Sequence, residues 1–398
     1  MANVKLSNVI RRAQTKVDKD NTDLIFYVGG EHIVSENIRV QSRGIIAEST
    51  IGPMFYYGFK AGDFLLVSRN PHLKKAGLVD FDGICSEKTF VLETADSDVL
   101  LPEFLPFVLQ NERFWDYAYR HRHGSTNTFI NWSTLANYEF ELPDLETQRK
   151  LAEVLWSIND TMDAYKKLIS ATNELVKSQF IERFGKPGTD PFRWGLTTLG
   201  KCCELNPRKP KGINTDDSYS FVAMPSVSED GHIDASVERP YSEVCKGFTY
   251  FAENDVLFAK ITPCMENGKG GVAKGLKNGV GFGSTEFHVL RPIKGVSDPY
   301  WLYIITMFSK FRSDAEKVMT GTGGQRRVPI TYLSEYSITL PPIELQEQFA
   351  AFVRQSDKSK FAALQCCSQS IMPRNDKLYD FCGTYHGSMA IAMYASLI

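Results

Sequence analysis

Four stretches of the chain carry basic and amide side chains but contain no acidic residue. They are residues 64–79, 117–138, 267–285 and 317–334. Lysine and arginine neutralise phosphates, and arginine, asparagine and glutamine present paired donors and acceptors to base edges. Glycines let backbone amides approach a phosphate closely. This mixture favours contact with nucleic acid, although a solvated basic surface loop is the alternative for any single stretch.

Within these stretches the side chains divide by the contact that each type makes best. We expect phosphate contacts mainly from four lysines: Lys74, Lys75, Lys269 and Lys274. We expect contacts in the major groove from six residues: Arg120, Arg122, Asn127, Gln325, Arg326 and Arg327. The predicted DNA-binding set is completed by Arg69, Ser125, Thr128, Lys260 and Thr322.

The sequence contains no recognisable catalytic or metal-binding constellation. "VGFGS" (280–284) lacks the strand, turn and helix of a dinucleotide fingerprint, and "KGG" (269–271) lacks the spacing of a P-loop. "DPYW" (298–301) lacks the second proline of the amino-methyltransferase motif. The pair His121 and His123 lies in a basic run that disfavours a cation. We therefore expect no catalytic residue, no metal and no cofactor on this chain.

Length and composition are typical of a folded protein with two or three domains, because the chain has 398 residues of which 43% are hydrophobic. The formal net charge of −2 excludes a polycation, so a nucleic-acid role needs local basic patches or partners. No apolar run is long enough to span a membrane. The eight cysteines, with the adjacent pairs Cys202-Cys203 and Cys366-Cys367, favour reduced thiols in the cytoplasm.

The chain contains an internal repeat, which explains why its basic stretches come in pairs. "YEFELP" (138–143) corresponds to "YSITLP" (336–341), 198 positions later. The same offset relates several further pairs: Ser86 and Ser284, Val91 and Val289, Leu135 and Leu333, Gln148 and Gln346. A constant offset over separated blocks makes chance similarity improbable. Alternating residues before each proline predict a strand, and a helical pattern follows it.

The repeat predicts a mixed α/β (α+β) fold with two equivalent domains. We place these domains at residues 1–143 and 186–341, with long helices over 144–185 and 342–372 and a C-terminal tail over 373–398. Asp144 is the expected N-cap of the first helix and Gly185 its stop. About 40 residues of helix span about 60 Å, so such a helix acts as a spacer.

Both long helices carry a seam of apolar residues at spacings of three and four, which indicates a partner helix. The seam residues of the first helix are Leu151, Leu155, Ile158, Met162, Tyr165, Ile169 and Val176. Those of the second are Leu345, Phe349 and Phe352. Two spacers of this kind predict an antiparallel coiled coil that separates the two domains about a pseudo-twofold axis.

Three functions are compatible with these patterns. The first is a non-catalytic DNA-recognition scaffold with two readers and one helical ruler. The second is a single-chain DNA methyltransferase or nuclease, which the missing cofactor motif disfavours. The third is a coiled-coil protein adaptor that does not touch DNA, which the acid-free stretches disfavour.

The duplicated segments "LPDLETQRKLAEVL" (142–155) and "LPPIELQEQFAAFV" (340–353), together with "WGLTTLG" (194–200), resemble the specificity subunit of type I restriction-modification systems. The resemblance covers about residues 4–370. It implies two target recognition domains that read a bipartite, asymmetric double-stranded DNA sequence, with helices that space them and dock modification subunits. It further implies that S-adenosylmethionine binds to those modification subunits, that ATP and Mg²⁺ act on restriction subunits, and that this chain is not itself an enzyme.

Overall fold

The computed structural model describes residues 2–322 and 324–371, the last of these from residue 359 by their backbone alone. The predicted tail, residues 373–398, lies outside the described residues. Contacts divide the chain into two compact units at Met162 and Asp163, inside the first long helix. The predicted domain borders at residues 143 and 186 instead place this whole helix between the domains, and those borders remain a prediction.

The first repeat is built from short strands in three sheets. One four-stranded sheet has the order β2-β9-β6-β7, a second has the order β4-β3-β8-β5, and β1 pairs with β10. The strands are β1 (Ala2–Lys5), β2 (Ile10–Ala13), β3 (Phe26–Val28), β4 (Gly44–Ile45), β5 (Phe55–Phe59), β6 (Phe64–Val67), β7 (Ala76–Leu78), β8 (Gly83–Ser86), β9 (Thr89–Thr94) and β10 (Glu139–Leu142). The α-helices are α1 (Leu6–Val9), α2 (Leu105–Leu109), α3 (Glu112–Arg120) and α4 (Trp132–Leu135).

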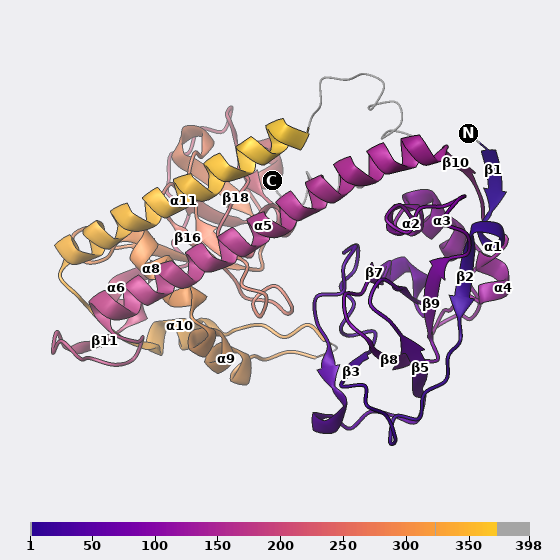
Figure 1. The fold of residues 1–398 in the computed structure, drawn as a ribbon. Helices are drawn as coiled ribbons and strands as arrows, with labels where there is room; N and C mark the ends of the chain where they lie inside the picture. The colour runs from indigo at the N-terminus through magenta and orange to yellow at the C-terminus, as the bar shows by residue number, and fades with distance from the viewer. Residues whose placement is uncertain (1, 323, 372–398) are drawn as a thin grey trace. The chain divides into compact units, whose positions relative to one another are not determined.

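The second repeat has the same strand order at every position. Its sheets read β12-β19-β16-β17, β14-β13-β18-β15 and β11-β20. The strands are β11 (Leu196–Thr198), β12 (Cys203–Leu205), β13 (Ser218–Val222), β14 (Glu238–Pro240), β15 (Thr249–Ala252), β16 (Val256–Ala259), β17 (Gly270–Val272), β18 (Val280–Gly283), β19 (Phe287–Pro292) and β20 (Ser337–Thr339). The α-helices are α6 (Leu199–Cys202), α7 (Tyr241–Val244), α8 (Pro299–Met307), α9 (Ser309–Lys317) and α10 (Ile330–Glu335). The predicted mixed α/β fold with two repeated domains is thus confirmed strand by strand (Figure 1).

A long helix follows each repeat: α5 (Leu145–Phe184) after the first and α11 (Ile343–Ile371) after the second. The predicted cap is present, because Asp144 accepts a hydrogen bond from the amide of Thr147 at 2.8 Å. This bond lowers the pKa of the Asp144 carboxyl. Gly185 ends α5 at a φ of +80°, the left-handed conformation that glycine adopts most readily.

A buried glutamine fixes the start of each long helix. Gln148 accepts a hydrogen bond from the amide of Leu101 at 2.9 Å and donates to the carbonyls of Val99 and Pro143 at 2.9 and 2.8 Å. Gln346 repeats these contacts with Asp298, Val296 and Pro341 at 3.0, 3.0 and 2.8 Å. In each repeat, the glutamine of the Pro-x-x-x-x-Gln segment therefore joins three parts of the chain: the end of the last strand, the following helix and the loop before α2 or α8.

The predicted seam of α5 is buried at Leu151, Met162, Tyr165 and Val176, and partly buried at the remaining positions, Leu155, Ile158 and Ile169. At the start of α11, Phe349 is buried and Phe352 is partly buried, but Leu345 is 37% exposed. Gln346 occupies the buried face in that first turn instead, because its amide satisfies three backbone groups there.

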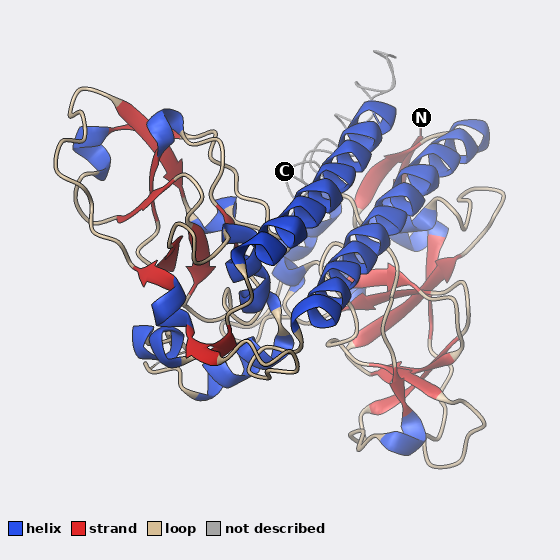
Figure 2. Ribbon diagram, turned by 90° about the vertical axis from the view of Figure 1, so that its left-hand side faces the viewer, coloured by secondary structure: helices blue, strands red, loops and turns tan. Residues whose placement is uncertain are grey.

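Within the second unit, the C-terminal part of α5 and the N-terminal part of α11 lie side by side (Figure 1, Figure 2). The Phe349 ring contacts the rings of Phe180 and Phe184 with centroid distances of 5.5 and 5.4 Å. Val176 and Val353 belong to the same core cluster, so later residues of α5 meet earlier residues of α11. This part of the pair is antiparallel. Pairing along the full length and the pseudo-twofold arrangement of the domains stay predictions.

Candidate nucleic-acid interface

Two backbone hydrogen bonds close the loop that follows α3, and two more hold it to the segment after β6. We call residues 121–130 loop 1. His123 and Phe129 exchange two bonds of 2.7 and 2.9 Å, which close the loop as a hairpin. The amide of Ile130 donates to Ser68 at 2.9 Å, and the amide of Asn70 donates to Thr128 at 2.7 Å. The tip of loop 1 is therefore carried on a rigid base.

The second repeat holds its equivalent loop in the same way. We call residues 318–322 and 324–328 loop 2. Thr320 and Arg327 exchange bonds of 3.0 and 2.8 Å. The amide of Val328 donates to Lys260 at 2.9 Å, and the amide of Thr262 donates to Arg326 at 3.0 Å. The two loops thus share one backbone scaffold, and their side chains carry the difference between them.

A glycine turns each loop where no other residue fits. Gly124 has a φ of +86° and Gly321 a φ of +134°. A Cβ atom at these positions would lie 2.9 Å from the carbonyl oxygen of Asn127 and 2.3 Å from that of Gln325. The glycines predicted to let the backbone approach a phosphate therefore have a second role, which is to close the hairpins.

Loop 1 and its neighbours present unpaired polar side chains to solvent. Arg120, Ser125 and Asn127 are exposed and have no side-chain partner among the described residues. Arg69 is also exposed and forms no ion pair within hydrogen-bonding distance there, but its charge helps to lower the pKa of Glu87. Arg122 differs, because its guanidinium donates to the carbonyl of Tyr119 at 2.6 Å and lies 3.8 Å from the centroid of that ring. Thr128 is also different, since it is buried and its hydroxyl donates to Asn70 at 3.3 Å.

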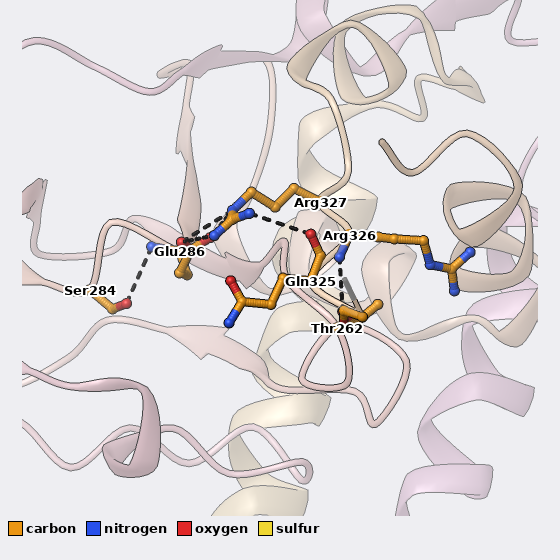
Figure 3. A network of polar contacts seen from close by, with 7 residues as sticks. Thr262, Ser284, Glu286, Gln325, Arg326 and Arg327 are labelled. Atoms are coloured by element: carbon orange, nitrogen blue, oxygen red, sulfur yellow. Dashed lines mark hydrogen bonds and ion pairs between the residues drawn. The ribbon is translucent and has the colours of Figure 1, made fainter. Parts of the chain in front are cut away.

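The two arginines of loop 2 are both paired with carboxylates. Arg327 donates to Glu286 through Nε at 2.9 Å and through Nη2 at 2.9 Å, and this pairing lowers the pKa of Glu286. Arg326 extends in another direction (Figure 3), and its Nη2 lies 3.4 Å from both Glu266 and Glu316. The acid-free sequence of loop 2 therefore does not leave its arginines free of acidic neighbours.

Beside these arginines, Thr322 and Gln325 are exposed, and their side chains have no partner in the described part of the chain. Lys260 is half-buried at the end of β16, and burial lowers the pKa of its ammonium group. Loop 2 therefore combines paired arginines with an exposed amide, and a partly desolvated lysine lies next to it.

The four lysines predicted to contact phosphates each have a partner within the protein. Lys74 is held by Glu112 and by Glu36, the latter at 2.9 Å. Lys75 and Lys269 donate to the carbonyls of Gly30 and Met224 at 2.6 and 3.4 Å, and Lys274 donates to the side chain of Asn254. Lys274 alone among the four is exposed. Because Lys74 has two carboxylates beside it, its charge is already offset.

Sequence reasoning missed the carboxylates that pair with the arginines. Glu266, Glu286 and Glu316 come from three separate segments and meet loop 2 only in the folded chain. It also missed two exposed aromatic side chains, Tyr119 beside loop 1 at 44% exposure and Phe129 within loop 1 at 38%.

Two observations limit other kinds of site. Among the side chains that the structure describes, in residues 2–322 and 324–358, no three of His, Cys, Asp or Glu are grouped so that they could hold a metal ion. In residues 2–322 and 324–371, none of the helices combines the length and the apolar character that crossing a bilayer requires. A separate feature is His288 of β19, which is buried and whose Nε2 lies 2.8 Å from the Val328 carbonyl of loop 2. Burial lowers the pKa of His288 to about 4.

Comparisons with known proteins agree with the duplicated fold. The model of the type I restriction modification DNA specificity domain matches twice, over residues 5–173 and 193–365. The EcoEI specificity subunit of Escherichia coli is 37% identical over 188 residues, which is 44% of this chain and 31% of the relative. The EcoAI specificity subunit of the same organism is 38% identical over 194 residues, or 46% of this chain and 33% of the relative.

The matched stretch thus spans about a third of the length of these curated relatives. Among solved structures, the S subunit of a type I restriction-modification system from M. genitalium matches all of this chain and 96% of its own, with a TM-score of 0.52 and 12% identity. That likeness shows the fold alone. Since the family model covers both repeats, the chain belongs to the family of type I restriction modification DNA specificity domains.

Proposed function

We propose that this chain is the DNA-recognition subunit of a type I restriction-modification complex and that each repeat reads one half of a bipartite target. The observation that carries the proposal is the pair of loops with one backbone scaffold and different side chains. Loop 1 offers Ser125 and Asn127, with Arg120 at the end of α3 beside it, whereas loop 2 offers Thr322, Gln325 and two arginines. A common scaffold with different donors and acceptors is what reading two different base sequences requires.

We assign phosphate contacts and base contacts to individual residues from the partners that each side chain has in the folded chain. Arg69, Arg120 and Lys274 are exposed cations that can neutralise phosphates without first leaving a carboxylate. Asn127 and Gln325 carry exposed amides, which can bond adenine through two atoms in the major groove. Ser125 and Thr322 carry exposed hydroxyls that can also bond DNA directly, whereas the side chains of Lys74, Lys75, Arg122, Arg326 and Arg327 first need the release of an internal partner.

Assembly forms the second part of the proposal. The helices α5 and α11 would dock modification subunits, with restriction subunits joining the same complex in the cytoplasm. S-adenosylmethionine would then belong to the modification subunits, and ATP and Mg²⁺ to the restriction subunits. We propose residues 1–143 and 186–341 as the two reading domains and 144–185 and 342–372 as the spacers between them.

The proposal is tested by enrichment of a random duplex DNA library with the full-length chain, alone and with modification subunits. The expected result is a motif of two specified parts separated by a gap of fixed length. Because the net charge is only −2, we expect tight binding at physiological salt only when modification subunits are present. A library that stays random in both preparations would refute a role in DNA recognition.

A further inference from the structure

A carboxylate already occupies the Nε and Nη2 edge of Arg327. A guanidinium has five N–H donors in a fixed fork, and bidentate recognition of guanine uses two that lie side by side. In Arg327 the Nε and Nη2 edge faces Glu286 at 2.9 Å on both atoms (Figure 3). The Nη1 group lies 3.4 Å from the carbonyl oxygen of Gln325. While this pair is intact, Arg327 cannot present that edge to a base.

The partner of Arg327 is itself fixed by the backbone. Glu286 lies in the turn between β18 and β19, and its amide donates to the hydroxyl of Ser284 at 3.2 Å. Its carbonyl accepts from the amide of Lys260 at 2.9 Å. The ion pair therefore ties loop 2 to the turn before β19 and, through Lys260, to the end of β16.

The first repeat anchors loop 1 without an ion pair at the corresponding positions. The positions that correspond to Glu286 and Arg327, each 198 earlier, hold Lys88 and Phe129. Phe129 makes the same backbone bonds as Arg327, and its ring lies 5.7 Å from that of His123. Since one repeat uses an aromatic residue and the other an arginine, what the two positions share is the anchoring of the loop.

Arg326 and Gln325 are placed differently. The contacts of Arg326 with Glu266 and Glu316 are both 3.4 Å long and involve only Nη2, so they are weaker than the fork at Arg327. The Gln325 side chain is exposed, and its amide has no partner among the described residues. A phosphate can replace the carboxylates at Arg326, and a base edge can meet the amide of Gln325 directly.

We propose that Glu286 and Arg327 form a positioning pair for loop 2, that Gln325 selects a base of the second half-target, and that Arg326 contacts the DNA backbone. The inference rests on the proposed function, because it assigns roles within the second reading domain. It changes the expectation for Arg327, which the sequence alone places among the groove-contacting residues.

The test uses library enrichment and binding titrations with the full-length chain and modification subunits. The variants are Glu286→Gln, Arg327→Gln, the double variant, Gln325→Ala and Arg326→Gln. Glu286→Gln and Arg327→Gln should each weaken discrimination in the second half of the motif about tenfold. The double variant should lose no more discrimination than either single variant. Gln325→Ala should lose about tenfold discrimination at one base pair, within the usual range for a bidentate contact.

Salt dependence separates positioning from direct contact. Arg326→Gln should lower the slope of log affinity against log salt concentration by about one, and Arg327→Gln should leave that slope unchanged. Glu238→Gln is the matched control, because it removes a carboxylate from the exposed pair with Lys277 in the same unit and should change neither the motif nor the slope.

The outcomes distinguish the inference from the function on which it rests. An Arg327→Gln loss that persists or grows in the Glu286→Gln background would show that Arg327 contacts DNA itself and would overturn the positioning role. A lower salt slope for Arg327→Gln would also overturn the positioning role. An unchanged motif for Gln325→Ala would overturn the proposal that Gln325 reads a base. If the wild-type chain enriches no motif, the proposed function fails instead.

Discussion

Replacing Gln346 by leucine should destabilise the second unit strongly, although the side chain is far in sequence from any predicted DNA contact. Leucine keeps about the same volume but has no hydrogen-bonding atoms, so it removes all three bonds of Gln346 and keeps water out. Two of the orphaned groups belong to buried residues, the amide of Asp298 and the carbonyl of Pro341. Val296 is partly exposed, and its carbonyl can regain water.

The expected magnitude follows from the two groups that stay buried. An unsatisfied buried donor or acceptor costs about 1–3 kcal/mol, so two of them give about 4 kcal/mol. A loss of this size is a large fraction of the stability of a domain. Gln348→Leu is the control, because Gln348 is exposed on the same helix and its replacement should change the stability by less than about 0.5 kcal/mol.

Hydrogen exchange is the suitable assay, because a chain with two units need not unfold in one step. The amide of Asp298 should lose about a thousandfold of its protection in Gln346→Leu, which is the factor that 4 kcal/mol gives. Amides of the first unit should keep theirs. The corresponding change Gln148→Leu should lower the exchange protection of the Leu101 amide in the first unit and leave that of the second unit unchanged. A loss of less than tenfold at Asp298 would show that the glutamine does not anchor the helix start.

Three further predictions concern the second unit and the exposed cations. The pKa of His288 is near 4 in the folded chain against 6.5 for the free side chain, so the unfolded chain binds a proton first as the pH falls. The free energy of unfolding should therefore fall by about 3 kcal/mol as the pH drops from about 6.5 to about 4. A stability that does not change with pH in the wild type, or a His288→Gln variant with the same pH dependence as the wild type, would contradict this. Gly321→Ala should weaken only the second half of the enriched motif, because the new methyl group would meet the carbonyl of Gln325, and an unaltered motif would show that the loop tolerates the change. Arg69→Gln should lower the salt slope of DNA binding by about one at every sequence, and a loss confined to a single motif would point to base reading instead.

The sequence predicted the parts of this fold that repeat, because repetition makes weak patterns visible. The offset of 198 positions is found again in the sheets, where β9 and β19 hold the same place in their strand orders. The bounds of α5 were also predictable, since Asp144 and Gly185 cap a long periodic segment. The duplicated Gln148 and Gln346 were visible as markers, but their hydrogen bonds were not, because the partners lie almost 50 positions away.

The charge pattern was harder to interpret, because ion pairs form between distant segments. A stretch without acids appears basic in the sequence, yet Glu286 reaches Arg327 from 41 positions away and Glu112 reaches Lys74 from 38. Contacts between near neighbours in sequence, such as Arg122 over Tyr119 at the end of α3, were equally hidden. For this reason the loops could be found from sequence, whereas the roles of their individual residues required the folded chain.

The central claim is that loop 1 and loop 2 read separate halves of one DNA target. Its most direct test enriches a random duplex library with three forms of the chain. They are the wild type, a double variant with Asn127→Ala in loop 1 and Arg120→Ala beside it, and a double variant with Gln325→Ala and Arg326→Ala in loop 2. Each pair of changes should erase one part of the two-part motif and leave the other part and the gap intact. Equal weakening of both parts by either pair would contradict the claim.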